Sequence, residues 1–409
     1  MERLCLALIP IAFVLALPAT AALIRLGHRL KTFDSQGVPG QIKASRRRVP
    51  NTGGIAIFWA IIAPILLGLA LLANIDASPT AGWRDDFSFL PADLHEYVAG
   101  VQQQTPMALA LLASLTLLHV LGLFDDRRPL GPWLKLAIMA LPALAIPLLF
   151  PDTRLLTLLD PHVGGRWLSI LITLLWFLVV TNAMNFMDNM DGLSAGVAAV
   201  ASAFFLAATL TSGSPQWFVA ACLALVMGAC LGFLCFNHPA RGPARIYMGD
   251  GGSLVLGFLL AFLTIRTTYV PVQIEYLATA PPDATGPITQ RTPAGAWYGL
   301  LMPLVVLAVP LYDFASVVVI RLSQGRSPFV GDTQHLSHRL VRRGLGTTAA
   351  VSVIHGLTAV TGAAGLVLGA LRPALAIVIG LQVALILALI AVFEYASPTK
   401  SPPAPERKA

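Results

Sequence analysis

The chain has 409 residues, of which 56% are hydrophobic and only 11% are charged. About a quarter of the residues of soluble globular domains are charged, so this composition excludes that class and indicates an integral membrane protein. The formal net charge is +7, but the basic residues are spread over many short segments. We therefore expect contact with anionic membrane lipid and no binding of nucleic acid.

Apolar runs long enough to cross about 30 Å of hydrocarbon recur along the whole chain. They predict an all-α, polytopic membrane protein with about eleven transmembrane helices, near residues 4–24, 53–73, 106–124, 133–150, 167–184, 193–211, 216–236, 251–268, 297–320, 349–370 and 374–395. The first run has a short basic start, as a signal peptide does. We interpret it as a retained span because the charge pattern requires one there.

The lysines and arginines predict the orientation of these spans, because cytoplasmic connections carry the excess of both. One alternate set of connections, together with Lys135, holds 20 of the 27 basic residues, and the other set, together with Arg266 at its border, holds 6. The richer set contains 25–52, 125–132, 185–192, 237–250, 321–348 and the C-terminal tail. We therefore predict an inner (plasma) membrane protein with its N-terminus outside and its C-terminus in the cytoplasm.

The predicted organisation is one transmembrane domain, residues 1–396, followed by a proline-rich, disordered cytoplasmic tail, residues 397–409. The four cysteines lie within apolar spans and show no spacing typical of a zinc site or a disulfide framework. We interpret them as packing residues.

The first polar cluster ends the third predicted span, where Asp125 and Asp126 precede two arginines. Adjacent carboxylates can orient a phosphate-bearing substrate, hold a metal ion or accept a proton; a solvated helix end is the alternative. Lys135 lies just inside the fourth span, where a charge is unfavourable. It is either a functional residue or a lysine that extends to the lipid headgroups.

The second polar cluster follows the fifth span and contains Asn182, Asn185, Asp188 and Asp191. A spacing of three lets several of these side chains face one point on a helix. Carboxylate and carboxamide oxygens suit a hard cation such as Mg²⁺. The alternative is a capped, polar helix end, which requires fewer polar residues.

The third cluster is Asp250, which lies among Gly249, Gly251 and Gly252 at the start of the eighth span. These glycines allow close approach of the backbone, and the N–H groups that begin a helix favour an anion. We predict a metal ligand beside a phosphate-binding turn. A glycine-rich turn with a capping aspartate is the alternative.

The fourth cluster, His335 and His338 with Arg326 and Arg339, follows the ninth span. It can bind a diphosphate or a lipid phosphate, or it is a basic loop on lipid headgroups. Asp313, inside that span, is a further candidate. All four clusters lie on the predicted cytoplasmic face. Together they favour metal-assisted phosphoryl transfer between a soluble nucleotide compound and a lipid.

Five segments, taken together, resemble the polyprenyl-phosphate N-acetylhexosamine-1-phosphate transferases. This family includes the enzymes that begin O-antigen and common-antigen synthesis and the phospho-MurNAc-pentapeptide translocase. The segments occur in order, as RRRVPNTGGIAIF (46–58), GLFDDRRPLGPWLKL (122–136), TNAMNFMDNMDGLSAG (181–196), FNHPARGPARIYMGDGGSLVLGF (236–258) and PLYDFASVVVIRLSQGRSPFVGDTQHLSHRL (310–340).

The resemblance implies a UDP-linked N-acetylated sugar and a polyprenyl phosphate as substrates, UMP as a product, and Mg²⁺, alternatively Mn²⁺, as the cofactor. It implies that Asn185 and Asp250 hold the metal. The other implied catalytic residues are Asp125 and Asp126 at the lipid phosphate, Lys135 at the diphosphate, Asp188 and Asp191 in the nucleotide and metal pocket, and His335 and His338. The implied substrate-binding residues are Tyr247 against uracil, Arg46 and Asn51 beside the nucleotide, and Asn182, Arg326 and Arg339.

One position departs from the family, which usually shows His-x-His-His where this chain has His335-Leu336-Ser337-His338. Ser337 carries no charge, so we expect Arg339 or Arg342 to supply any missing diphosphate contact. The same segment argues against the peptidoglycan branch, which has three consecutive histidines there. The Pro-Asn-Thr-Gly-Gly run that begins at residue 50 and the Arg-Ser-Pro-Phe run at residues 326–329 resemble the O-antigen and common-antigen branch.

The transferred sugar and a homodimeric state remain open at this stage, with GlcNAc as the default sugar. A transporter of ions or nucleotide sugars and a Mg²⁺-dependent lipid phosphatase are the rival functions. A transporter would place acidic residues near the middle of several spans, and here only Asp313 lies clearly inside one.

Overall fold

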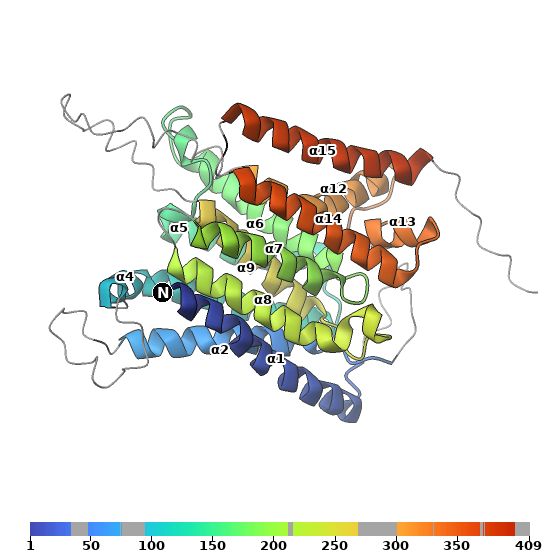
Figure 1. Ribbon diagram of the computed structural model, residues 1–409, viewed down its shortest axis with the longest axis horizontal. Coiled ribbons are helices and arrows are strands. Elements are labelled where there is room, and N and C mark those ends of the chain that lie inside the picture. Colours follow the sequence, from blue (N-terminus) through green and yellow to red (C-terminus); the bar gives the residue numbers. More distant parts are fainter. Residues whose placement is uncertain are drawn as a thin grey trace, which may run out of the picture.

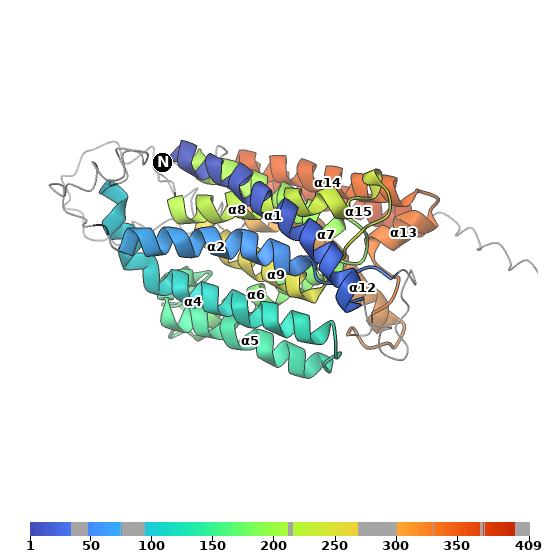
Figure 2. The same ribbon diagram turned by 90° about the horizontal axis from the view of Figure 1, so that it is seen from below.

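A computed structural model describes residues 1–33, 48–73, 75, 95–211, 216–268, 301–329, 331–368, 371 and 373–396. The secondary structure of this part consists of α-helices, three short 3₁₀ turns and two isolated β-bridges, which are joined by turns and loops. The long helices run side by side as a bundle, with α4 and α5 adjacent along one edge (Figure 1; Figure 2).

Ten helices of the described part are long and apolar enough to cross a membrane. They are α1 (Glu2–Leu30), α2 (Gly53–Ala73), α4 (His95–Asp125), α5 (Pro132–Leu149), α6 (Trp167–Met187), α7 (Leu193–Leu210), α8 (Trp217–Asn237), α9 (Asp250–Thr268), α14 (Thr347–Val367) and α15 (Pro373–Ala396). They confirm the prediction of an all-α, polytopic membrane protein.

The remaining predicted span, 297–320, begins outside the described residues. Its described part is helical from 301 to 306 and, after a turn at Leu307, continues as α12 (Ala308–Ser323). The short helix α13 (Leu336–Arg342) and the 3₁₀ turns η1 (Pro151–Thr153), η2 (Thr157–Leu159) and η3 (Pro239–Arg241) complete the described elements.

Helix α4 is longer than the predicted span, since it begins at His95 instead of near residue 106. Its added turns carry Gln102, whose Nε2 donates to the carbonyls of Leu72 and Ile75, both at 2.9 Å. The last carbonyls of a helix lack partners within that helix. This extension of α4 therefore satisfies polar groups at the end of α2.

Helix α9 lies at the centre of the bundle, since 89% of its membrane-spanning residues are buried. Helices that are apolar all round gain no hydrophobic energy by leaving lipid, so close contact between small residues largely decides how they pack. In α8, a β-carbon added at Gly228 would lie 2.1 Å from the Ile9 carbonyl oxygen of α1. Glycine at this position therefore sets the contact between α1 and α8.

Gly228→Ala is expected to lower the free energy of unfolding by about 1–3 kcal/mol, because the added methyl group meets backbone that must shift. Gly68→Ala in α2 is the matched control, since its β-carbon would meet nothing within 4 Å. There the better helix propensity of alanine should raise stability by up to about 1 kcal/mol. Unfolding in detergent measures both variants, and equal losses at the two sites would contradict this packing.

Candidate active site

The termini of four membrane-crossing helices meet at one end of the bundle and bring together most of the predicted site. Asp125 ends α4, Lys135 lies in the first turn of α5, Asn185 lies in the last turn of α6, and Asp250 begins α9. We call the group of Asp125, Asp126, Lys135, Asn185, Asp188 and Asp250 the polar cluster. The sequence placed these residues on one face, and the structure joins them directly.

Lys135 is the cation of the polar cluster. Its Nζ lies 2.9 Å from Asp125 Oδ2 and also forms an ion pair with Asp250. The side chain is 16% exposed, so this lysine does not extend to the lipid headgroups. The second oxygen of Asp125 accepts the Leu130 backbone N–H at 2.6 Å, which fixes the turn between α4 and α5.

Asp126 caps the N-terminus of α9. Its Oδ1 accepts the Asp250 backbone N–H at 3.2 Å and the Asn51 amide at 3.0 Å, while Oδ2 lies 3.5 Å from the Gly251 nitrogen. The start of a helix attracts negative charge. The N–H groups predicted to bind a phosphate therefore engage a carboxylate of the protein itself in this structure.

Gly249 makes this capping arrangement possible. Its φ is +70°, a conformation that favours glycine. A β-carbon there would also lie 2.4 Å from Asp126 Oδ2 and 2.5 Å from Asn51 Oδ1. Any other residue at 249 would disrupt the cap.

Two segments far apart in sequence form the side of the site next to Asp126. Asn51 and Tyr247 form a parallel β-bridge, in which the Tyr247 N–H donates to the Pro50 carbonyl at 2.8 Å and the Gly53 N–H donates to the Tyr247 carbonyl at 2.9 Å. The predicted nucleotide-binding residues Asn51 and Tyr247 are therefore neighbours. Arg46, the third predicted residue of this group, lies outside the described residues.

The polar cluster holds more negative charge than Lys135 alone can balance. Burial, together with the nearby Asp250 carboxylate, raises the pKa of Asp126 to about 8. Burial and the charges of Asp250 and Asp126 raise the pKa of Asp188 well above its usual value. A bound divalent cation would favour the ionised form of all these carboxylates.

The donor atoms of the cluster fit a hard cation, although the described residues contain no preformed group of three His, Cys, Asp or Glu side chains that could hold a metal. The Asn185 amide donates to Asp250 Oδ1 at 2.8 Å and to Ser253 Oγ at 2.9 Å. Mg²⁺ is commonly held by one or two carboxylates together with substrate phosphates. Metal binding by Asn185 and Asp250 stays a prediction.

Two residues of the second predicted cluster make other contacts. Asp191 Oδ2 accepts the Ala244 backbone N–H at 3.1 Å, so it anchors the loop that leads to Asp250. The Asn182 amide donates to the Leu178 carbonyl of its own helix at 2.8 Å. Their predicted roles at the nucleotide and the metal remain predictions.

His119, a buried histidine in α4, holds the first turn of α9 and was missed in the sequence. Its Nδ1 lies 2.7 Å from the Gly251 carbonyl, and its ring stacks on Phe58 with centroids 4.1 Å apart. Because a carbonyl only accepts hydrogen bonds, Nδ1 carries the proton. The signal available in the sequence was an ionisable residue inside an apolar span.

His119→Leu is expected to lower the free energy of unfolding by about 0.5–1.5 kcal/mol, because the Gly251 carbonyl loses the hydrogen bond from the imidazole N–H. In His119→Asn the side-chain amide can reach the same carbonyl, so most of that loss should be recovered. Thermal unfolding in detergent gives the comparison. If both variants lose the same stability, shape rather than the hydrogen bond explains this histidine.

The histidine segment, residues 334–338, is held by α12 and by the end of α6. Fully buried Asp313 accepts from His335 Nδ1 at 2.9 Å and from the Leu336 N–H at 2.6 Å. Ser337 is hydrogen-bonded to Asn189, just after α6. The serine that replaces the usual family histidine therefore ties this segment to the turn that carries Asp188.

His338 is the less buried of the two histidines. Burial and the charges of His335 and Arg342 lower the pKa of His338. It is therefore suited to remain neutral near pH 7 and to accept a hydrogen bond.

The arginines of this region differ in their availability to a substrate. Arg339 is 6% exposed, and its guanidinium donates to Glu394, Ser316 and the Gln334 carbonyl. Arg342 donates to Thr333 and Gln334, while Arg326 is exposed. The predicted substrate contact of Arg339 is not favoured by this arrangement, because its donors are already satisfied within the protein.

The chain is similar to a known protein family and to several individual enzymes. The model of glycosyl transferase family 4 matches residues 108–268. A probable undecaprenyl-phosphate N-acetylglucosaminyl 1-phosphate transferase of Bacillus subtilis is 24% identical over 321 residues, which cover 78% of this chain and 72% of that protein. The decaprenyl-phosphate N-acetylglucosaminephosphotransferase of Mycobacterium tuberculosis H37Rv is 30% identical over 321 residues, 75% of this chain and 69% of that protein.

A phospho-N-acetylmuramoyl-pentapeptide-transferase of Desulforudis audaxviator is 29% identical over 269 residues, 63% of this chain and 74% of that protein. The family-model match, residues 108–268, includes the α4, α6 and α9 termini that form the polar cluster. Together with these relatives, it confirms the resemblance seen in the sequence motifs. The chain belongs to glycosyl transferase family 4, the family of the polyprenyl-phosphate N-acetylhexosamine-1-phosphate transferases.

Proposed function

We propose that this protein transfers an N-acetylhexosamine-1-phosphate from a UDP-sugar to undecaprenyl phosphate or another polyprenyl phosphate. The products are a polyprenyl-diphosphate-sugar and UMP. The observation that carries this proposal is the polar cluster, in which Asp125, Asp250 and Lys135 meet at the termini of membrane-crossing helices. Such a site can receive a lipid phosphate from the bilayer and a nucleotide from water.

The reaction requires little proton transfer from the protein. A phosphate monoester has its second pKa near 6, so the lipid phosphate is mostly dianionic at neutral pH. One of its oxygens attacks the sugar-linked phosphorus, and the bond from that phosphorus to UMP breaks, with UMP taking the electron pair. The role proposed for Asp125 and Asp126 is to align this nucleophile, and that of Lys135 is to contact the diphosphate.

Mg²⁺, alternatively Mn²⁺, is the proposed cofactor, with Asn185 and Asp250 as its protein ligands. When bound, such an ion would neutralise the negative charge of the phosphates and so assist phosphoryl transfer. The excess of carboxylates over cations around Asp126 and Asp188 supports this assignment. The residues of the chain itself then position the two substrates and balance the charge of their phosphates.

The proposed nucleotide pocket uses Asn51 and Tyr247, whose aromatic ring is suited to stack on uracil. Their β-bridge beside the cap of α9 supports this placement. The proposed location of the site is the cytoplasmic face of the inner membrane. The default sugar is GlcNAc, and the proposed role is to start O-antigen or common-antigen synthesis. A homodimer is the oligomeric state to be tested. A transporter is less favoured, because the acidic residues of the cluster lie at helix ends instead of midway along the spans.

Purified protein incubated with UDP-GlcNAc, Mg²⁺ and undecaprenyl phosphate tests the proposal. UMP release that requires the lipid is the expected result, while free phosphate from the lipid alone would indicate a phosphatase. Exchange of UMP with a panel of UDP-sugars identifies the sugar. If no UDP-sugar supports lipid-dependent UMP release, the proposed function is wrong.

A further inference from the structure

Glu394 is the only charged residue of α15. Its side chain is 1% exposed. A carboxylate in a membrane-crossing segment is unfavourable unless it is paired, so such a residue suggests a function. Here Oε2 accepts from Arg339 Nε at 3.1 Å and from the Tyr312 hydroxyl at 3.0 Å. The carboxylate thus joins three helices, α12, α13 and α15.

Arg339 links Glu394 to the histidine segment. Its Nη1 donates to the Gln334 carbonyl and its Nη2 donates to Ser316 Oγ at 2.9 Å. Gln334 directly precedes His335, so the guanidinium holds the backbone at the point where α13 begins. The next residue of α12 after Tyr312 is Asp313, which binds the His335 ring. Two consecutive residues of α12 therefore fix the histidine segment, one directly and one through Glu394 and Arg339.

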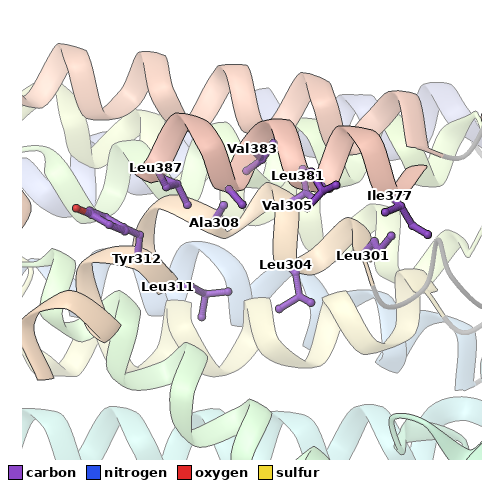
Figure 3. A pocket seen from close by; sticks show the side chains of 12 residues that line it. Leu301, Leu304, Val305, Ala308, Leu311, Tyr312, Ile377, Leu381, Val383 and Leu387 are labelled. Atoms are coloured by element: carbon purple, nitrogen blue, oxygen red, sulfur yellow. The ribbon is translucent and has the colours of Figure 1, made fainter. Parts of the chain in front are cut away.

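Packing between α15 and the segment 301–312, which includes the first turn of α12, leaves an open space. A groove of about 530 Å³ lies there and is lined by apolar side chains such as Leu304, Leu311 and Leu381. The Tyr312 hydroxyl lies at one end of this groove (Figure 3). The ion pair of Glu394 therefore supplies a polar attachment of α15 to the site at a place where close apolar packing with α12 is limited.

We propose that Glu394 is a positioning residue, which acts through Arg339 to hold the histidine segment and makes α15 part of the catalytic apparatus. This inference rests on the proposed function where it assigns His338 to the reaction. Removal of the carboxylate would leave the Arg339 guanidinium buried without a counter-charge. Such a cation moves toward water, and that movement would release the Gln334 carbonyl and loosen the start of α13.

Hydrogen exchange tests this connection without any substrate. In Glu394→Leu, the backbone amides of residues 334–342 should exchange at least about tenfold faster, while those of 247–253 keep the wild-type rate. Gln382→Leu is the matched control, since it exchanges an exposed polar residue of the same helix for leucine. Unchanged protection of 334–342 in the Glu394 variant would overturn the proposal. If that variant is not recovered folded, Glu394→Gln and Tyr312→Phe make the same test with a smaller expected increase.

A kinetic double-mutant cycle then separates positioning from a general loss of stability. Glu394→Leu and His338→Ala should each lower kcat, and the double variant should be no slower than His338→Ala alone, because Glu394 acts through the segment that carries His338. Fully additive effects would overturn the inference. A wild-type protein without lipid-dependent UMP release would contradict the proposed function instead, and the exchange experiment would still decide the connection.

Discussion

Asp250→Asn is expected to reduce kcat at least about a thousandfold, equivalent to about 4 kcal/mol of transition-state stabilisation. The carboxylate of Asp250 is the point where Lys135, Asn185 and the N-terminus of α9 meet. Asparagine preserves the size of the side chain but removes the charge that the proposed cation and Lys135 require. Turnover is measured as lipid-dependent release of UMP, and the melting temperature in detergent reports whether the fold is retained.

The matched control is Asp160→Asn, which removes an aspartate paired to Arg154 at 2.6 Å in the connection between α5 and α6. This ion pair lies at the opposite end of the bundle from the polar cluster, since Lys135 starts α5 and Asn185 lies near the end of α6. Its kcat should stay within about twofold of wild type. Full activity of Asp250→Asn would show that neither the metal nor the lysine depends on this carboxylate.

The sequence predicted the polar cluster because its members occupy helix termini. A span of known length places its end at a membrane face, so Asp125, Asn185 and Asp250 could be assigned to one face before their contacts were known. The glycines around Asp250 likewise indicated an anion at the start of α9. In the structure the carboxyl group of Asp126 occupies this position at the start of α9.

Pairings between distant side chains were beyond the sequence. Ser337 and Asn189 are 148 residues apart, and Arg339 and Glu394 are 55 apart. Which of two basic residues turns inward depends on how helices pack, and in membranes that packing follows shape more than hydrophobicity. The contact of Arg339 with Glu394 therefore could not be predicted, and its predicted contact with the substrate stays a prediction. Glu394 itself offered a usable signal, a lone charge in an apolar span.

Lys135→Met is expected to lower both the turnover number and the concentration of Mg²⁺ that the enzyme requires. The kcat should fall by about 10²–10³, as when one charged or hydrogen-bonding contact to a transition state is lost. The concentration of Mg²⁺ at half-maximal activity should also fall. The ammonium group of Lys135 forms an ion pair with Asp250, so it competes with a cation for that carboxylate and repels the cation electrostatically. Methionine has a similar length and brings no charge.

A titration of UMP release with Mg²⁺ at saturating UDP-sugar and lipid separates the two effects. Lys135→Arg serves as the control, because it keeps the positive charge and should leave the Mg²⁺ requirement near that of wild type while its larger, planar head group lowers kcat. An increased Mg²⁺ requirement in Lys135→Met would mean that the lysine helps to assemble the metal site instead of competing with it. Asp250 and Lys135 are thus expected to affect the cation in opposite senses, and this difference distinguishes a ligand from a neighbouring charge that must give way to the metal.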